Sequence, residues 1–302
     1  MIKKIFITFF TISLFLKPIF AHAKIQIDEY AGNIYVENAT VQELEDLFKK
    51  HKYQRFNALK DDAYPAIFVK TLPSDFQQIP SLKHRNELFI RILTPLALKI
   101  NEEILNDRNH VLRIERQFEN NTISDIDIQN IERLSQKYDF FTRSKDKNNR
   151  LSEQINNLKL RIDKIPVSIL IAYAAIESNW GSSRIANIAN SLYKEKLWFT
   201  DEGLEPLENK EDGYRFKIFN SLIESMRSFA ITFNSNKNYH RVWLARKDLR
   251  AKRTDVFGES LAYTLSITNT LPNFAGILTY TTAFYDLYYL DTGKLKRINA
   301  HE

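Results

Sequence analysis

The chain lacks cysteine altogether and contains few glycine and proline residues. With no cysteine in 302 residues, disulfides, thiolate zinc sites, iron–sulfur clusters and cysteine nucleophiles are all excluded. Seven glycines and eight prolines exclude a collagen-like chain and a turn-rich all-β protein, and they favour helix. A hydrophobic content of 44% at this length provides a core for one large domain or two smaller ones.

Sequence motifs for metal and nucleotide binding are also missing. The six histidines include no H-E-x-x-H motif and no close pair, so a zinc site is not expected. The chain contains no G-x-G-x-x-G motif, no P-loop and no G-x-S-x-G motif. We therefore expect neither a metal nor a cofactor.

Residues 1–23 have the layout of a secretory signal peptide. A basic start precedes an apolar stretch that ends in an A-x-A motif at residues 21–23. Lys17 and Pro18 interrupt that stretch, so we favour a cleaved signal over the alternative of an uncleaved membrane anchor. Cleavage removes three lysines and lowers the net charge from +6 to +3, which is poor support for nucleic-acid binding. We expect an exported protein, periplasmic or secreted, with no integral membrane span in its mature form.

The remaining chain divides into an N-terminal, mainly helical region, a second helical region and a short tail. Thr40 begins a capping box that predicts a helix start. Pro95 lies within a long helical pattern and should bend or break that helix. A polar run at residues 143–150 is the expected boundary. The predicted regions are therefore 24–150, 151–292 and 293–302.

The second region is predicted to be a bundle of helices with one irregular lobe. Residues 167–176 are apolar on nearly all faces, which indicates a buried helix, and Gly181 fits its C-terminal stop. Residues 194–219 carry several acids and breaks and are predicted to form a loop with a short hairpin. Further helices are expected at 220–234, 240–250, 257–268 and 273–290. The fold class is therefore mainly α.

Glu177 stands out because it follows the apolar run and falls in the last turn of the buried helix. Burial and the negative end of the helix dipole both disfavour an ionised carboxylate there, as a general acid requires. The structural alternative is a carboxylate paired with a base such as Arg184. Nearby Trp180 is either a surface on which a sugar stacks or a part of the core.

The segment around Glu177 carries a family resemblance. Residues 165–184, IPVSILIAYAAIESNWGSSR, resemble the P-x-S-x-x-L-A-x-A-A-x-E-S-x-W-G-x-S-R signature of the peptidoglycan N-acetylglucosaminidases, the mannosyl-glycoprotein endo-β-N-acetylglucosaminidase-like domain. Residues 190–193, NSLY, look like the family's N-N-L-F element, and residues 219–229 are similar to its F-x-S-x-x-E-S helix. Residues 85–104 look like the N-terminal region of the Bax-type branch.

The resemblance implies a lysozyme-like, mainly helical catalytic domain that cleaves β-1,4 bonds of the peptidoglycan glycan strand. It implies that Glu177 is the general acid. The G-L-M-Q element of lytic transglycosylases is absent, which favours the glucosaminidase side. The substrate-binding residues that we expect are Trp180, Asn190, Tyr193, Trp198 and Phe274.

The chain also departs from the family pattern. Lys194 replaces a family glycine, and Ile267 and Thr268 occupy the place of a family tyrosine. Arg215 falls near the place of the family's second carboxylate, so Glu208 and Glu211 are the candidates for that role. A two-carboxylate mechanism and participation by the substrate's N-acetyl group both remain open.

Three functions follow from these observations. The first is an exported peptidoglycan hydrolase with Glu177 as general acid, whose partner is the glycan strand. The second is a cell-wall-binding protein that has kept the groove and lost its activity. The third is an amidase that acts on the peptide stem. It has the least support, because the sequence shows neither a metal site nor a nucleophile–base pair.

Overall fold

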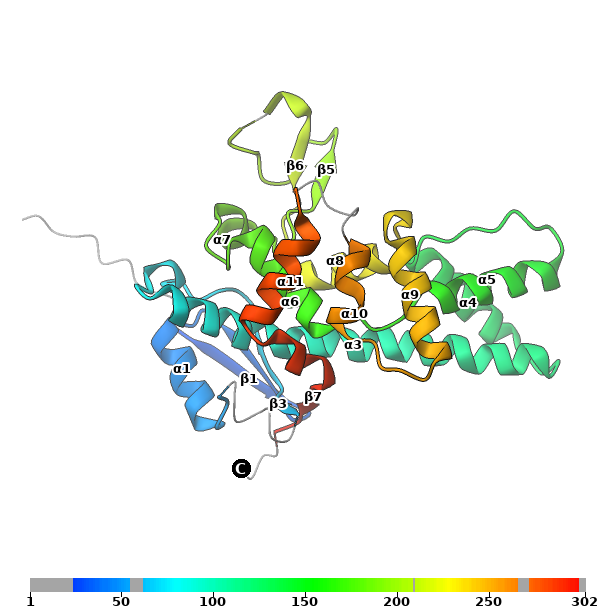
Figure 1. The fold of residues 1–302 in the computed structure, drawn as a ribbon, viewed down its shortest axis with the longest axis horizontal. Coiled ribbons are helices and arrows are strands. Elements are labelled where there is room, and N and C mark those ends of the chain that lie inside the picture. Colours follow the sequence, from blue (N-terminus) through cyan, green and yellow to red (C-terminus); the bar gives the residue numbers. More distant parts are fainter. Residues whose placement is uncertain (1–23, 55–61, 209, 266–271, 299–302) are drawn as a thin grey trace, which may run out of the picture.

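The computed structural model describes residues 24–54, 62–208, 210–265 and 272–298, and they form a mainly helical protein built around one long helix (Figure 1). The mainly α prediction is confirmed. The predicted signal peptide and the positions Ile267 and Thr268 lie outside the described residues. Within the described residues, no helix is long and apolar enough to cross a membrane.

The N-terminal region contains a small sheet in addition to helix. Strands β1 (Gln26–Tyr30) and β2 (Asn33–Glu37) form an antiparallel hairpin, and β4 (Ile67–Val69) adds to β2 in parallel. Helix α1 (Val41–Lys50) begins with the predicted capping box, in which Thr40 and Glu43 bond reciprocally. The N-terminal region therefore combines helices with this small sheet.

Helix α3 (Leu82–Glu119) runs through Pro95 without ending, so of the two expected outcomes, a bend or a break, the break does not occur. Proline has no N–H to give to the carbonyl four residues earlier, which here is that of Arg91. The hydroxyl of Tyr53 donates to the Arg91 carbonyl oxygen instead, at 2.9 Å. A side chain distant in sequence therefore satisfies the carbonyl that proline leaves without a donor.

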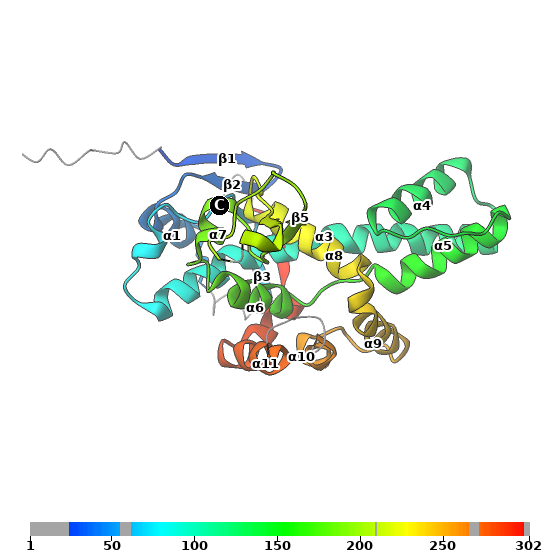
Figure 2. The same ribbon diagram turned by 90° about the horizontal axis from the view of Figure 1, so that it is seen from above.

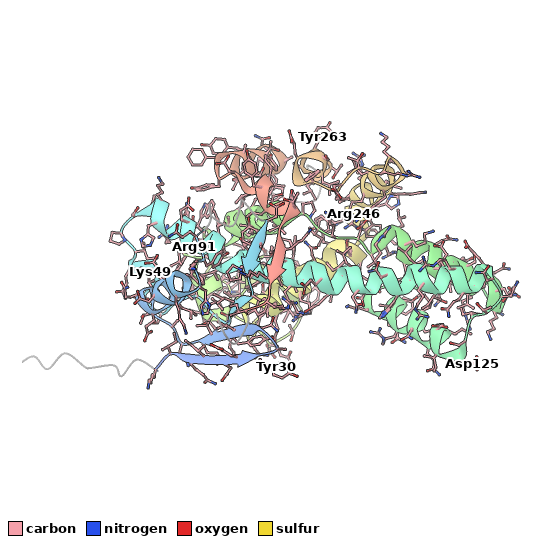
Figure 3. All side chains as sticks on the ribbon, turned by 90° about the horizontal axis from the view of Figure 1, so that it is seen from below. Tyr30, Lys49, Arg91, Asp125, Arg246 and Tyr263 are labelled. Atoms are coloured by element: carbon pink, nitrogen blue, oxygen red, sulfur yellow. The ribbon has the colours of Figure 1, made fainter. Side chains whose placement is uncertain are left out.

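Helices α4 (Asp125–Lys137) and α5 (Lys147–Arg161) pack as a pair at the far end of α3 (Figure 2). Asp125 marks this end of the molecule, and Tyr30 and Lys49 lie in the opposite half (Figure 3). The polar run at 143–150 spans a loop and the start of α5, so residue 150 lies inside a helix.

Helix α6 (Val167–Ser178) is central and almost wholly buried, as predicted, and it packs on α3 and α11. A carboxylate caps its first turn: Asp291 accepts hydrogen bonds from the backbone N–H and the hydroxyl of Ser168. The other helices of the described residues are α7 (Arg184–Ala189), α8 (Leu222–Ser235), α9 (His240–Ala251), α10 (Gly258–Ala262) and α11 (Phe274–Phe284). The short 3₁₀ turns are η1 (Phe76–Gln78), η2 (Lys210–Asp212), η3 (Lys237–Tyr239), η4 (Tyr263–Leu265) and η5 (Leu287–Thr292).

Two further strand pairs complete the fold. The predicted hairpin lobe is present as β5 (Lys196–Trp198) and β6 (Tyr214–Phe216), and it projects beyond α6 and α7 (Figure 1). The predicted C-terminal tail contains β7 (Lys294–Lys296), which pairs in parallel with β3 (Ala63–Pro65). Strand β7 therefore joins the predicted tail to the N-terminal region.

Candidate active site

Glu177 lies in the last turn of α6, where that helix emerges from the core. The preceding residues from Val167 to Ala175 are buried, whereas the Glu177 side chain keeps 12% of its surface exposed. This combination gives solvent or a ligand access to one carboxyl group on an otherwise uncharged helix. It is the geometry that a general acid needs.

Three consecutive left-handed residues turn the chain sharply after α6. Asn179, Trp180 and Gly181 have φ of 50°, 56° and 75°. A Cβ at Gly181 would lie 2.9 Å from Leu72 Cδ1, so the site requires glycine for its conformation and for its space. Ser178 donates to the Ala174 carbonyl and accepts from the Gly181 N–H. The serine next to Glu177 therefore fixes the helix end and is not poised as a nucleophile.

Lys194 and Tyr239 are two of the titratable groups near Glu177. Lys194 Nζ lies 3.6 Å from Glu177 Oε2, and the lysine side chain is 39% exposed. Burial raises the pKa of the Tyr239 hydroxyl well above its usual range, and the neighbouring Tyr173 and the charges of Glu177 and Glu195 add to that rise. The tyrosine therefore stays neutral at physiological pH, and Lys194 supplies a positive charge beside the candidate acid.

The two tryptophans of the predicted groove differ in how far their rings are buried. Trp180 is partly buried, with its ring 4.3 Å from that of Tyr285 and 6.0 Å from that of Phe89. Trp198 lies on β5 and is 54% exposed, with Lys196 Nζ 5.5 Å from its ring centre. Trp198 therefore offers free aromatic surface, whereas much of Trp180 packs against neighbours.

We predict that Trp198→Ala weakens chitooligosaccharide binding by about 1–3 kcal/mol, because an aromatic ring that covers a sugar face buries apolar area. Its melting temperature should stay close to that of the wild type, whereas Trp180→Ala should lower it. Titration calorimetry and thermal unfolding measure the two quantities. Phe141→Ala, an exposed aromatic in the loop between α4 and α5 (73% exposed), is the control. Unchanged affinity in Trp198→Ala would remove this residue from the binding surface.

Tyr193 and Phe274, both expected to bind substrate, lie in the core. Tyr193 is 6% exposed, donates from its hydroxyl to the Leu170 carbonyl and stacks on Phe229 with ring centres 4.0 Å apart. Phe274 is 1% exposed and packs 4.7 Å from Tyr173. Neither ring has a face left for a sugar, so the structure gives both a packing role.

Asn190 also has a structural role. It ends α7 in the left-handed conformation, with φ of 49°. Its Nδ2 donates to the Phe219 carbonyl oxygen at 3.0 Å and ties α7 to the segment before α8. The side chain therefore positions backbone.

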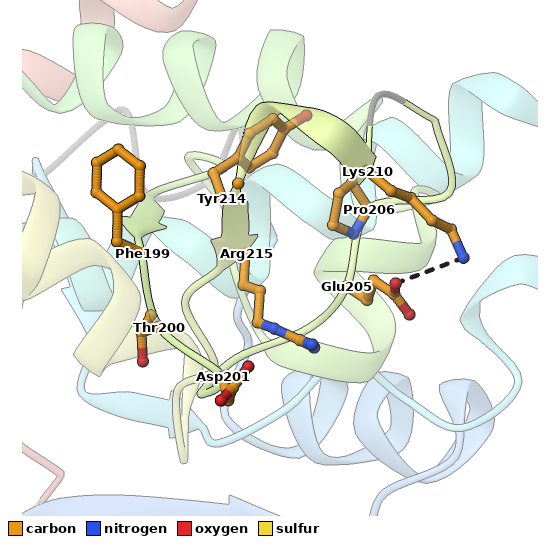
Figure 4. Close-up of a pocket in the computed structure, with 9 residues that line it drawn as sticks. Phe199, Thr200, Asp201, Glu205, Pro206, Lys210, Tyr214 and Arg215 are labelled. Carbon is orange, nitrogen blue, oxygen red and sulfur yellow. Dashed lines mark ion pairs between the residues drawn. The ribbon is translucent and has the colours of Figure 1, made fainter.

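The acids of the hairpin lobe lie on its surface. Glu208 and Glu211, the predicted candidates for a second carboxylate, are both exposed. The lobe holds a pocket of about 310 Å³, but neither of them lines it. Figure 4 shows Arg215 among the lining side chains, and Lys210 pairs with Glu205 at 3.5 Å. The basic side chain that departs from the family pattern thus contributes to this pocket.

Glu195 is an acid that sequence analysis missed. Its Oε2 accepts a hydrogen bond from the Ser228 hydroxyl at 2.7 Å, and its Oε1 is buried without a hydrogen-bond partner among the described residues. Burial raises the pKa of this carboxyl, against opposing effects of Ser228 and Lys217. No pattern distinguished Glu195 from the acids of the lobe, because its burial depends on the packing of α8 against the start of β5.

Comparison with known proteins finds a family similarity in this part of the chain. Residues 153–276 match the family model described as mannosyl-glycoprotein endo-beta-N-acetylglucosaminidase. The matched segment is mainly helical and carries Glu177 at the end of its buried helix. This part of the chain is therefore similar to the glucosaminidase family, as the residues around Glu177 had indicated.

Two individual proteins are also similar. Protein bax of Escherichia coli (strain K12) is 26% identical over 216 residues, which cover 72% of this chain and 71% of that protein. The catalytic domain of the autolysin Auto from Listeria monocytogenes is 16% identical, with a TM-score of 0.36, over 73% of this chain and 90% of that domain.

Proposed function

We propose that this protein is an N-acetylglucosaminidase that hydrolyses β-1,4 bonds of the peptidoglycan glycan strand. The observation that carries the proposal is the place of Glu177, a carboxyl group 12% exposed at the end of a buried helix, within the segment that matches the glucosaminidase family. In this role Glu177 protonates the oxygen of the leaving sugar. The protein's export stays a prediction from residues 1–23.

The second catalytic group is either another carboxylate of the protein or the N-acetyl group of the substrate. Glycosidases with two carboxyl groups hold them on either side of the bond that is cut. Glu208 and Glu211 remain the lobe candidates for this role, and both would have to approach the substrate from an exposed surface. The alternative is participation by the substrate's own N-acetyl group, which requires only Glu177 and an orienting group.

The test of the proposed reaction is digestion of purified sacculi, with mass spectrometry of the soluble fragments. We expect fragments with reducing N-acetylglucosamine ends. Anhydro-muramic ends would instead show a lytic transglycosylase, and cleaved stem peptides on intact glycan would show an amidase.

One observation favours a second candidate, a wall-binding protein with little activity. Lys194 stands where the family pattern has a glycine, and its ammonium group lies 3.6 Å from Glu177 Oε2, the proposed acid. Under this alternative, the protein sediments with sacculi and releases no soluble fragment at any pH.

A further inference from the structure

A second pocket lies where helices α5 and α9 pack against each other. Its volume is about 380 Å³, within the range of roughly 300–1,000 Å³ that small-molecule sites have. The side chains that line it in the described part of the chain are Asn157, Leu160, Arg161, Lys237, His240 and Trp243. They include two cations and no carboxylate, so the lining favours an anion.

Arg161 is a buried cation of this pocket that pairs with no acid of the described residues. It is 6% exposed, and its guanidinium carbon lies 4.7 Å from the centre of the Trp243 ring. Its Nη1 donates to the carbonyl oxygens of Tyr138, Asp139 and Ser235. Burial lowers the pKa of the guanidinium and the charge of the exposed Asp139 acts against this, but an arginine stays charged at physiological pH. Buried charges in proteins are usually paired, and this one has room for a partner.

The edge of the Arg161 guanidinium formed by Nε and Nη2 is the part that the described residues leave unused. Nε is buried without a hydrogen-bond partner, and the three bonds to carbonyl oxygens all start from Nη1. The same edge binds a carboxylate elsewhere in this protein. Arg227 donates from Nε and Nη2 to Glu103 at 2.9 and 3.0 Å, and Arg250 donates from Nε and Nη2 to Asp163 at 3.1 and 2.7 Å. Arginine prefers this two-point contact with carboxylates and phosphates.

The other lining residues add donors and apolar surface. Lys237 and His240 are exposed, and their side chains supply N–H donors that a ligand can reach. Trp243 has its Nε1 bonded to the Phe233 carbonyl at 2.9 Å, so its ring contributes apolar surface, as Leu160 does. The pocket therefore combines a buried arginine, accessible donors and an apolar wall.

We propose that this pocket binds an oxyanion, the carboxylate or phosphate group of a ligand, through Arg161, Lys237 and His240. The site is separate from the proposed catalytic one, because Arg161 ends α5 ahead of α6, whereas Glu177 lies in the last turn of α6. It goes beyond the proposed function and does not depend on it. Two sources supply this chemistry: the carboxylates of a peptide attached to the cell wall, and phosphate in solution.

Titration calorimetry at low salt tests the site with three probes: inorganic phosphate, a soluble muropeptide with free carboxylates, and the same muropeptide with its carboxylates amidated. We expect saturable one-site binding of phosphate, of the free muropeptide or of both, which identifies the source, and no binding of the amidated form. The double variant Lys237→Met/His240→Ala changes two exposed side chains and should weaken binding roughly tenfold, since each exposed contact contributes up to about fivefold.

Asn157→Asp tests Arg161 without removing it, because Arg161 also holds three backbone carbonyls. The new carboxylate stands four residues before Arg161 on α5, the spacing at which an acid and an arginine pair on a helix. It should occupy the unused edge and weaken oxyanion binding about tenfold or more, with the melting temperature unchanged or raised. Lys49→Met, at an exposed lysine of α1 labelled in Figure 3, removes one charge elsewhere and is the control.

The proposal is overturned if neither phosphate nor the free muropeptide binds saturably, or if the amidated muropeptide binds as well as the free one. Equal weakening by Lys49→Met and by the pocket variants would also overturn it, because that result indicates attraction by overall charge. Glu177→Gln should bind the probes as the wild type does, so failure of the proposed catalytic function is recognised separately from failure of this site.

Discussion

Replacing Glu177 with glutamine is expected to slow the release of soluble fragments from sacculi by about 10²-fold or more. Glutamine keeps the size of the side chain but has no acidic proton, and removal of a general acid costs a factor of this order. The side chain is 12% exposed and its charged partner is 39% exposed, so loss of the pair should cost the fold only about 0–1 kcal/mol. Turbidity loss of a sacculus suspension and unfolding of the same preparation measure the two effects.

Glu259→Gln is the control for this experiment. Glu259 is an exposed acid on α10, and its replacement removes the same charge and should leave digestion unchanged. Sedimentation with sacculi shows whether the Glu177→Gln variant still binds. Equal digestion by this variant and the wild type would exclude Glu177 as the acid.

Local sequence signals predicted the elements that local interactions determine. The capping box at Thr40 forms as expected because both of its hydrogen bonds lie within four residues. The buried helix that carries Glu177 was recognisable because a helix without a polar face has to be enclosed on all sides. The hairpin lobe was predicted from its breaks, and β5 pairs with β6 within it.

Features that depend on distant contacts were not predictable in the same way. The continuity of α3 at Pro95 requires a donor from Tyr53, 38 residues away from the carbonyl it satisfies. The burial of Glu195 requires α8 to supply Ser228. Tyr193 and Phe274 were expected to bind sugar because an aromatic residue near a catalytic segment suits both a groove and a core. Only packing distinguishes the two roles.

A further group that pattern analysis did not reveal is a buried charge cluster before α6. Asp163 is 2% exposed, and Arg250 donates two hydrogen bonds to its carboxylate, at 2.7 and 3.1 Å. Arg246, 1% exposed and labelled in Figure 3, donates to the Asp163 carbonyl and to that of Arg161. The cluster fixes the connection between α5 and α6, and thereby the start of the helix that presents Glu177.

Asp163→Asn is therefore expected to lower the free energy of unfolding by about 3–5 kcal/mol, because it leaves the guanidinium groups of Arg246 and Arg250 without their buried counter-charge. Urea denaturation at pH 7 measures the loss. Glu102→Gln, which removes a half-exposed carboxylate paired with Arg297, should cost about 0–1 kcal/mol. A loss for Asp163→Asn no larger than that of this control would show that the cluster does not stabilise the fold.

The pH dependence of the stability difference between the wild type and Asp163→Asn gives a second check on the role of this cluster. Burial alone opposes ionisation of Asp163, but the hydrogen bonds from Arg250 and the charges of Arg246 and Arg108 outweigh it and hold the pKa of the Asp163 carboxyl below its usual range. A carboxyl group with a lowered pKa in the folded state stabilises the protein fully above its unfolded pKa, about 3.9, and loses that contribution as the pH falls through the folded value. The stability gap between wild type and Asp163→Asn should thus be constant from pH 8 to 5 and narrow below pH 4. A gap that widens in acid would contradict the lowered pKa.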